Sequence, residues 1–453
     1  MGITTNKSVP VRIVAAISFF LPFVVIFPEK GLTQPSSAPP IQSVQLTLKE
    51  AVQLALKQNP QVVAFRLLSL ESDRQRQISR SALLPQASLT STGAVSQYNL
   101  ASVERTTTRD TAGPYQFIQA GPAFSQKLLS LPLFRNYQVS REGVREAGAQ
   151  ETVTREDVAA SVVTQYILVL RAFATYDAAK VRVALAERLY EQASSLQKTG
   201  IGLNIDTVRA QVELQNERQN LIDAETSTHT TNYVLAELLN LPRDKEPVVT
   251  DKLKFFDLPD FEKTAAINTA LASRPEMQAQ ASQERIANLE RRSASEERVP
   301  QIGFSGFWLY QGSRFDNGVP AYRYQIDLIV PLFTSGRIHA EIALADLEQK
   351  RIEENRQLLE ARIVREVKSA TDELDAARKN VEVANLGLQL ANDEVAQADR
   401  RFAAGVTTNV EVVTAQDALA RANSNQIDAL YRFNQSRVNL ARAMGEVQNT
   451  YAK

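Results

Sequence analysis

The sequence predicts a mainly α-helical fold with a small β part, built from two structural repeats. The stretch GVTTNVEVVTAQDALA, which begins at Gly405, aligns with GIGLNIDTVRAQVELQ, which begins at Gly200. Both stretches keep a glycine, an asparagine and an Ala-Gln pair. Around each stretch, long helical patterns and short alternating runs follow one another in the same order. Self-similarity of this kind indicates a duplicated half-molecule.

The repeat extends well beyond these two stretches. AVQLALKQNP at 51–60 aligns with AINTALASRP at 266–275, and LPLF at 131–134 aligns with VPLF at 330–333. We therefore predict a chain divided as follows: a signal peptide at 1–34, an N-terminal linker at 35–45, a first repeat at 46–242, a linker at 243–260, a second repeat at 261–447 and a C-terminal tail at 448–453.

Composition excludes several classes of function. The 453 residues contain 51 Lys and Arg against 51 Asp and Glu, a balance that gives no electrostatic reason to expect nucleic acid. There is no cysteine, and the two histidines, His229 and His339, are far apart, so neither a disulfide nor a Cys/His zinc site can form. No phosphate loop, paired-histidine motif or nucleophile elbow occurs in its required context. We expect no enzyme activity, no metal and no cofactor.

The amino terminus predicts export. Lys7 and Arg12 precede the apolar run at 13–27, which is too short to span a bilayer comfortably and is followed by a polar, proline-rich stretch. This order is typical of a secretory signal, although a retained anchor remains an alternative. No later stretch approaches 18 uninterrupted apolar residues, so no transmembrane helix is expected in the mature chain.

Short alternating segments predict strands at about 86–131 in the first repeat and about 300–331 in the second. In AYRYQIDLIVP and QIGFSGFWLY, apolar and aromatic residues occupy every second position. Segments of roughly ten residues with aromatics at one end suit the wall of a membrane barrel. A soluble hairpin with one buried face is the alternative. A barrel would have an aromatic belt containing Trp308, Tyr310, Tyr322 and Tyr324.

Long helices follow the strands of each repeat. Thr47 and Glu50 form a capping-box pattern that opens a first helix running to about Leu84, and Pro85 and Pro300 end the first helices of the two repeats. After the second strand pair, apolar residues recur at spacings of four and three from Ile363 to Phe402, with every second core position occupied by alanine. This is a coiled-coil seam, and a helix from 333 to 404 would be roughly 100 Å long. A rod-like coiled-coil scaffold is the alternative.

Four strands cannot close a barrel by themselves. An open sheet edge in lipid leaves unpaired backbone groups, which cost several kcal/mol each. Two copies would give eight strands and a filled interior, whereas three copies give twelve strands and a lumen. A trimer is therefore the smallest conducting assembly.

The ends of the long helices predict tight reversals. Glycine at 200 and 405 suits a reversal between antiparallel helices, because it adopts positive φ without strain. Thr408 and Glu411 form a capping-box pattern, and Asn204 is placed to cap the equivalent helix, with Asp206 in its first turn. Capping alone could account for both acids.

The ordered set of motifs resembles the TolC-like outer-membrane efflux protein family. The residues that carry the resemblance are LTLKEAVQLALKQNP, the PLF at strand exits, RFAAG leading into TNVEVV, and the helix endings VLAELLNLP and NLARAMGEV. The resemblance implies a homotrimer with a 12-stranded β-barrel in the outer membrane, continued through the periplasm by a coiled-coil tunnel. It implies a passive exit duct of a tripartite efflux or type I secretion system. The alternative is an exported coiled-coil structural or interaction protein without a channel.

The resemblance also implies partners and sites. The partners would be a periplasmic adaptor protein, an inner-membrane pump of RND, ABC or MFS type, and outer-membrane lipid. Three copies of Asp206 and Glu411 would form a negative constriction, and the tip that docks the adaptor would contain Gly200, Gly405, Asn204 and Asn409. Where relatives have a second acid one turn on, this chain has Arg209 and Thr414, and Phe402 replaces a gate-bonding tyrosine.

Overall fold

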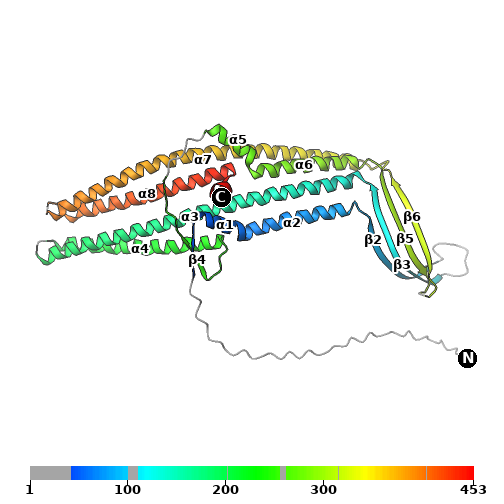
Figure 1. Ribbon diagram of the computed structural model, residues 1–453, viewed down its shortest axis with the longest axis horizontal. Helices are drawn as coiled ribbons and strands as arrows, with labels where there is room; N and C mark the ends of the chain where they lie inside the picture. The colour runs from blue at the N-terminus through cyan, green and yellow to red at the C-terminus, as the bar shows by residue number, and fades with distance from the viewer. Residues whose placement is uncertain are drawn as a thin grey trace, which may run out of the picture. The chain divides into compact units, whose positions relative to one another are not determined.

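A computed structural model of the chain describes residues 42–99, 111–200, 202–255, 262–314, 316–404 and 406–452. The expected signal peptide and Gly405 lie outside the described residues, as does most of the expected N-terminal linker. The part described is elongated, with a β-sheet at one end and two helical hairpins that reach to the other (Figure 1).

The elements follow the same order in both halves of the chain. The first half contains α1 (Leu48–Gln58), α2 (Pro60–Ser81), β2 (Gln86–Asn99), β3 (Thr111–Leu129), α3 (Leu131–Lys198) and α4 (Asn204–Leu238). The second half contains α5 (Lys263–Ser273), α6 (Pro275–Glu296), β5 (Gln301–Gly312), β6 (Val319–Ile329), α7 (Arg337–Ala403) and α8 (Asn409–Met444). The strands lie within the ranges predicted for them.

A proline divides the first helical region of each half, where a single helix was expected. The backbone of Asn59 is extended, with φ −61° and ψ 128°, and Pro60 starts α2. Proline disfavours helical angles in the residue before it and suits the first turn of a new helix. The Asn59 side chain accepts a bond from Gln61 N at 2.8 Å and so caps α2. The capping box of Thr47 and Glu50 at the start of α1 is confirmed.

The main sheet is antiparallel, with strand order β2-β3-β5-β6. Directly opposite residues share a face of a sheet. Trp308 faces Tyr322 across β5 and β6, and Gly306 faces Tyr324 on one side and Phe124 on the other. In contrast, Ser305 lies opposite both Ser125 and Gln325. The sheet thus has one largely apolar face and one largely polar face.

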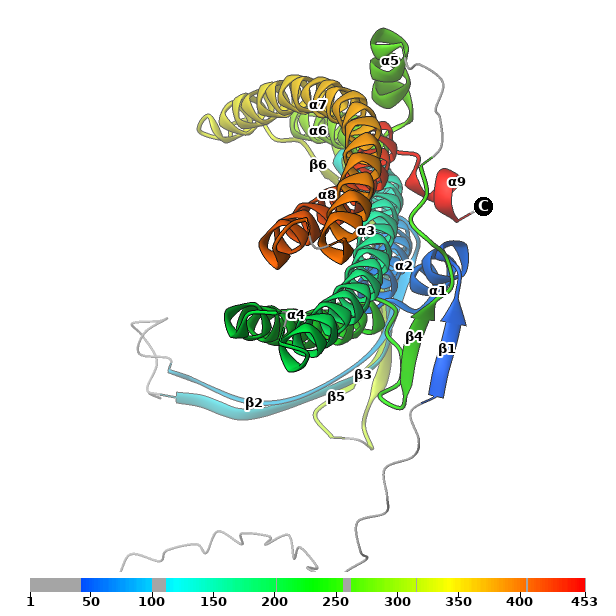
Figure 2. The same ribbon diagram turned by 90° about the vertical axis from the view of Figure 1, so that its left-hand side faces the viewer.

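A second, parallel sheet was not predicted. It pairs β1 (Gln42–Leu46) with β4 (Lys245–Val249), two short strands in regions expected to be linkers. The Tyr166 hydroxyl of α3 lies 2.8 Å from the carbonyl oxygen of Leu46 and 2.8 Å from Asp251 Oδ2, and its single hydrogen is shared between these two acceptors. This sheet, α1 and the C-terminal α9 (Val447–Tyr451) lie together on one side of the long helices (Figure 2).

The predicted coiled-coil seam of α7 is confirmed. Nine of the expected seam residues are buried, namely Ile363, Val367, Ala370, Leu374, Ala377, Val381, Ala391, Val395 and Ala398, and the other three, Ala384, Leu388 and Phe402, are half-buried. They pack chiefly against α8 and α5. Both α3, with 68 residues, and α7, with 67 residues, are roughly 100 Å long at about 1.5 Å per residue.

One helix is long and apolar enough to cross a bilayer by length and composition. This is α3, and half of its most apolar 18-residue window is buried inside the described part of the chain. The buried residues include Val158, Val162 and Tyr166, which form the core between α3, α1 and β1. A core helix passes the same test, so the window identifies no membrane span by itself.

Candidate functional site at the hairpin tips and the aromatic face of the sheet

The tips of the two hairpins lie together at the end away from the main sheet (Figure 1). Gly200 lies two residues after the end of α3 and has φ +78°, and its amide donates to the Gln197 carbonyl at 3.0 Å. Gly202, which the sequence did not single out, is required for a different reason. A Cβ there would lie 2.9 Å from the Gln197 nitrogen. The first tip therefore depends on two glycines.

Asp206 lies in the first turn of α4, as predicted. Its Oδ1 is 3.9 Å from Arg209 Nη1, and its side chain is 20% exposed. The predicted capping role of Asn204 is wrong, because the helix cap is Leu203 and no side chain caps the helix. Asn204 is instead the first helical residue, and its Oδ1 accepts a bond from Gln197 Nε2 at 3.0 Å across the turn.

Glu411 occupies the matching first turn of α8. The predicted capping box is wrong, because the side chain of Thr408 makes no capping bond. Glu411 instead accepts a hydrogen bond from the Thr407 hydroxyl, and its Oε1 lies 3.1 Å from Arg401 Nε. Its side chain is 40% exposed. Asn409 is the first residue of α8, at the same tip.

Each acid of the predicted constriction therefore has an arginine partner. Arg209 comes from the same turn as Asp206, whereas Arg401 reaches Glu411 from the last turn of α7. Arg401 is also placed favourably at the negative end of that helix dipole. Thr414 does not contribute a charge, and its hydroxyl donates to the Val410 carbonyl at 2.8 Å.

Phe402 is part of a hydrophobic cluster that joins the two hairpins. The buried members come from four helices and are Leu189 and Ala193 of α3, Ala210 of α4, Val395 and Ala398 of α7, and Val412 and Ala415 of α8. The ring of Phe402 packs against this cluster and is partly buried. The residue thus helps to hold the tips together by packing.

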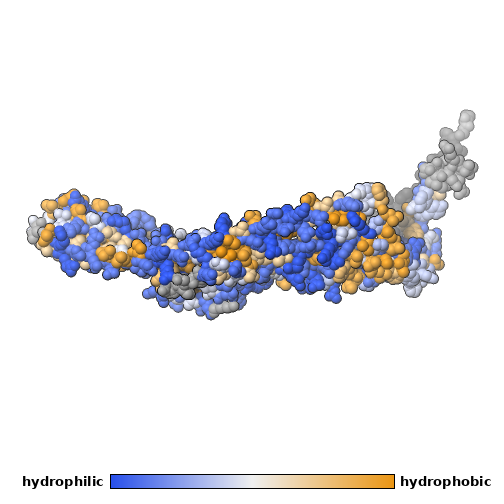
Figure 3. All heavy atoms as spheres, turned by 90° about the horizontal axis from the view of Figure 1, so that it is seen from above, coloured by the Kyte–Doolittle hydropathy of each residue, from blue (hydrophilic) through white to orange (hydrophobic). Residues whose placement is uncertain are grey.

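The predicted belt residues are all exposed in the single chain. Trp308 is 57% exposed and Tyr322 is 72% exposed, and Tyr310 and Tyr324 are similarly accessible. The rings of Tyr324 and Phe124 lie 5.8 Å apart across β5. They can meet because Gly306 lies between them, where a Cβ would be 2.6 Å from Phe124. Apolar residues form a band near the junction of sheet and helices (Figure 3).

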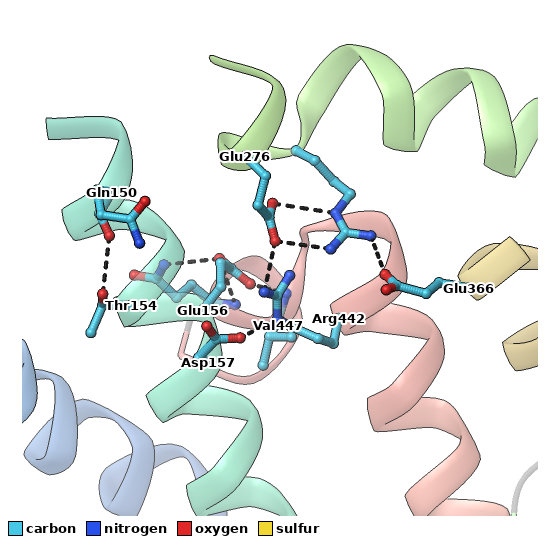
Figure 4. Close-up of polar contacts among 10 residues, drawn as sticks. Gln150, Thr154, Glu156, Asp157, Glu276, Glu366, Arg442 and Val447 are labelled. Carbon is cyan, nitrogen blue, oxygen red and sulfur yellow. Dashed lines mark hydrogen bonds and ion pairs between the residues drawn. The ribbon is translucent and has the colours of Figure 1, made fainter. Parts of the chain in front are cut away.

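A charged cluster near the middle of the long helices was missed by the sequence reasoning. Glu276 of α6 accepts bonds from Arg274 at 2.9 Å and from Arg442 of α8 at 2.7 Å (Figure 4). Arg274 also binds Glu366 of α7, and Arg442 binds Asp157 of α3. Burial alone would raise the pKa of Glu276, but the two arginines outweigh it and lower the pKa to about 2. The partners are far apart in sequence, which conceals the cluster.

The part of the chain that the structure describes contains no group of three His, Cys, Asp or Glu residues that could hold a metal ion. The hairpin tips instead carry the ion-paired Asp206 and Glu411, and the main sheet exposes aromatic side chains.

Comparison with known proteins identifies relatives over most of the chain. A family model described as outer membrane efflux protein matches residues 51–241 and 266–446. The outer membrane protein TolC of Vibrio cholerae is 23% identical over 376 residues, which cover 81% of this chain and 83% of that protein. The pyoverdine export outer membrane protein OpmQ of Pseudomonas putida is 24% identical over 284 residues, covering 59% of this chain and 57% of its own length.

Solved structures share the fold. The CmeC outer membrane channel of Campylobacter jejuni superposes with a TM-score of 0.77 at 17% identity, covering 88% of this chain and 85% of that one. The open state of the MtrE outer membrane channel of Neisseria gonorrhoeae has a TM-score of 0.75 at 17% identity, with 90% of each chain covered.

Proposed function

Because this chain belongs to the outer membrane efflux protein family, we propose that three copies assemble into the exit duct of a tripartite efflux system. The chain is an outer-membrane protein with a large periplasmic part. As a duct it would conduct substrates passively, and the transport energy would come from an inner-membrane pump joined through a periplasmic adaptor.

The observation that carries the proposal is the main sheet with its two open edges. β2 and β6 form those edges, and neither has a second partner strand among the described residues. The sheet is curved, and its apolar face would contact lipid while its polar face would line a lumen (Figure 2). Joining β6 of one copy to β2 of the next would satisfy the edges, and three copies would provide twelve strands.

The helices support the same assembly. The central helices follow the order of the strands, since α3 contacts α2 and α6, and α6 contacts α7. Each chain would therefore provide one third of both the barrel wall and the tunnel wall. The parallel order of elements in the two halves supports two structural repeats, the first at 46–242 and the second at 261–447.

At the periplasmic end, three copies of Asp206 and Glu411 would narrow the tunnel. Arg209 and Arg401 pair with these acids, so the net negative charge of the constriction would depend on whether the ion pairs are formed. The tips, with Gly200, Gly405, Asn204 and Asn409, would dock the adaptor. The pump would be of RND, ABC or MFS type. The same duct could also serve a type I secretion system.

Extraction and conductance test this proposal. The protein should require detergent for extraction, migrate as a trimer that dissociates on heating, and form conducting pores in planar bilayers. Extraction without detergent, together with an absence of pores, would favour a soluble coiled-coil scaffold instead.

A further inference from the structure

A basic groove lies between α3 and α6, close to the main sheet. It has a volume of about 530 Å³ and is lined by four arginines, Arg135, Arg141, Arg285 and Arg292, together with Gln138, Glu142, Asn288 and Leu289. Four guanidinium groups in one groove are unusual in a chain whose total charge is balanced. The partners of these four guanidinium groups determine how much positive charge the groove retains.

Two of the arginines are neutralised within the chain. Arg135 Nη2 lies 2.7 Å from Glu296, and Arg285 Nε lies 2.7 Å from Glu142. The other two, Arg141 and Arg292, are exposed, and neither has an ion pair or side-chain hydrogen bond with any described residue. The groove thus has a surplus of positive charge and two guanidinium groups that are free to bind an oxyanion, for which arginine geometry is well suited.

The groove opens on the outer side of the helical wall. Gln138 precedes Tyr166 by four heptads. Buried residues of α3 recur every seven positions at 142, 149, 156 and 163, as in a supercoiled helix, and in such a helix residues four heptads apart lie on the same side. Tyr166 contacts β1, and β1 lies on the convex side of the wall (Figure 2). Because α3 and α6 are the central helices of the wall, joining copies through its edges leaves this groove accessible.

The end of the groove nearest the sheet lies at the height expected for a lipid headgroup. Exposed apolar side chains mark the junction of sheet and helices, with Phe134 at 43%, Leu332 at 92% and Phe333 at 87% exposure. Arg135 and Arg141 lie roughly 6 to 15 Å along α3 from its start. The polar region on each side of a bilayer is about 5 to 8 Å thick. Arg135 therefore lies within the headgroup layer next to the apolar junction. Arg141 lies less than two turns further along α3, and its long side chain can reach back toward the layer because helical side chains tilt toward the helix N-terminus.

We propose that this groove binds the phosphate of an anionic phospholipid headgroup in the periplasmic leaflet of the outer membrane. Arg141 and Arg292 would bind the phosphate oxygens, while the two internal ion pairs hold the walls of the groove in place. The lipid would fix the depth and tilt of the barrel at its periplasmic rim. This inference rests on the proposed function, because it requires the sheet to span the membrane.

The test compares lipid binding by the detergent-purified trimer and by two variants of equal charge change. The groove variant is Arg141→Gln with Arg292→Gln. The control is Arg188→Gln with Arg400→Gln, two exposed arginines near the opposite end of the long helices. Phosphatidylglycerol, phosphatidylcholine and inorganic phosphate are titrated separately, and bound lipid is counted by native mass spectrometry.

Phosphatidylglycerol should bind the wild type and the control more tightly than phosphatidylcholine does. The groove variant should bind it roughly 30-fold more weakly, since each basic residue near an anionic surface contributes about fivefold. Equal phosphatidylglycerol binding by the groove variant would overturn the proposal. Displacement of the lipid by millimolar inorganic phosphate would also overturn it, because it would identify a free-phosphate site. A different result would contradict the proposed function itself: the wild-type chain would neither form a trimer nor require detergent for extraction.

Discussion

Arg401 Nε lies 3.1 Å from Glu411 Oε1 and thereby links the last turn of α7 to the first turn of α8. The pair places a cation beside one of the two acids expected to narrow the tunnel. Its side chains are 57% and 40% exposed, so the pair contributes little to stability, typically about 0.2 to 1 kcal/mol. Its larger effect is expected on the electric field at the tip.

Removing that cation should increase the negative charge of the opening. In the variant Arg401→Gln, three unpaired copies of Glu411 would concentrate cations, so cation selectivity in planar bilayers should rise. Arg400→Gln removes the same charge from the neighbouring residue and is the matched control. If both variants increase selectivity equally, Glu411 does not govern the opening.

Removing the acids should have the opposite effect. With Asp206→Asn and Glu411→Gln together, cation selectivity and block by multivalent cations should fall while the trimer persists. Added salt should shrink the difference from the wild type, because the Debye length is about 10 Å at 0.1 M. If the acids serve only as helix-start residues, each change costs roughly 0.3 to 1 kcal/mol and conductance stays the same.

The α7 seam should not tolerate a larger side chain. Ala377 is 4% exposed and packs in the core between α7 and α8, so Ala377→Leu should destabilise each chain by about 1 to 3 kcal/mol. Gly387 lies on the same helix with open space around its Cβ position, and Gly387→Ala should be tolerated or stabilising. Thermal unfolding of the two variants checks this, and equal melting temperatures would contradict the packing.

The charged cluster around Glu276 should stabilise the protein in a pH-dependent manner. The pKa of Glu276 is lowered from 4.5 to about 2, so its contribution is complete above pH 4.5 and is lost as the pH falls toward 2. Glu276→Gln should therefore cost on the order of 3 kcal/mol at pH 7 and progressively less below pH 4.5. Melting temperatures of both proteins from pH 7 to pH 3 provide the measurement. A constant difference would show that the carboxylate charge is not responsible.

Periodic features of the sequence predicted the helices and strands well. Features that depend on contacts between residues far apart in the sequence were not predicted. The α7 seam and the strands have periods that any short window reveals. The parallel pairing of β1 with β4 escaped because neither five-residue strand has a strong pattern, and their register depends on Tyr166 and Asp251. At the tips, Asp206 and Glu411 were placed correctly in first turns. The expected caps were wrong because Asn204 bonds across the turn to Gln197, and because Glu411 binds Thr407 and Arg401. Local capping rules do not include these contacts.

The most direct test of the channel uses the absence of cysteine from the chain. Ser313 lies in the turn between β5 and β6, at the end of the sheet away from the helices, and Thr199 lies at the tip of α3. Single cysteines are introduced at each position, and cells are treated with a membrane-impermeant maleimide. A duct that crosses the outer membrane predicts that Ser313→Cys is labelled in intact cells and that Thr199→Cys is labelled only after the envelope is ruptured. Labelling of both positions only after rupture would contradict the account.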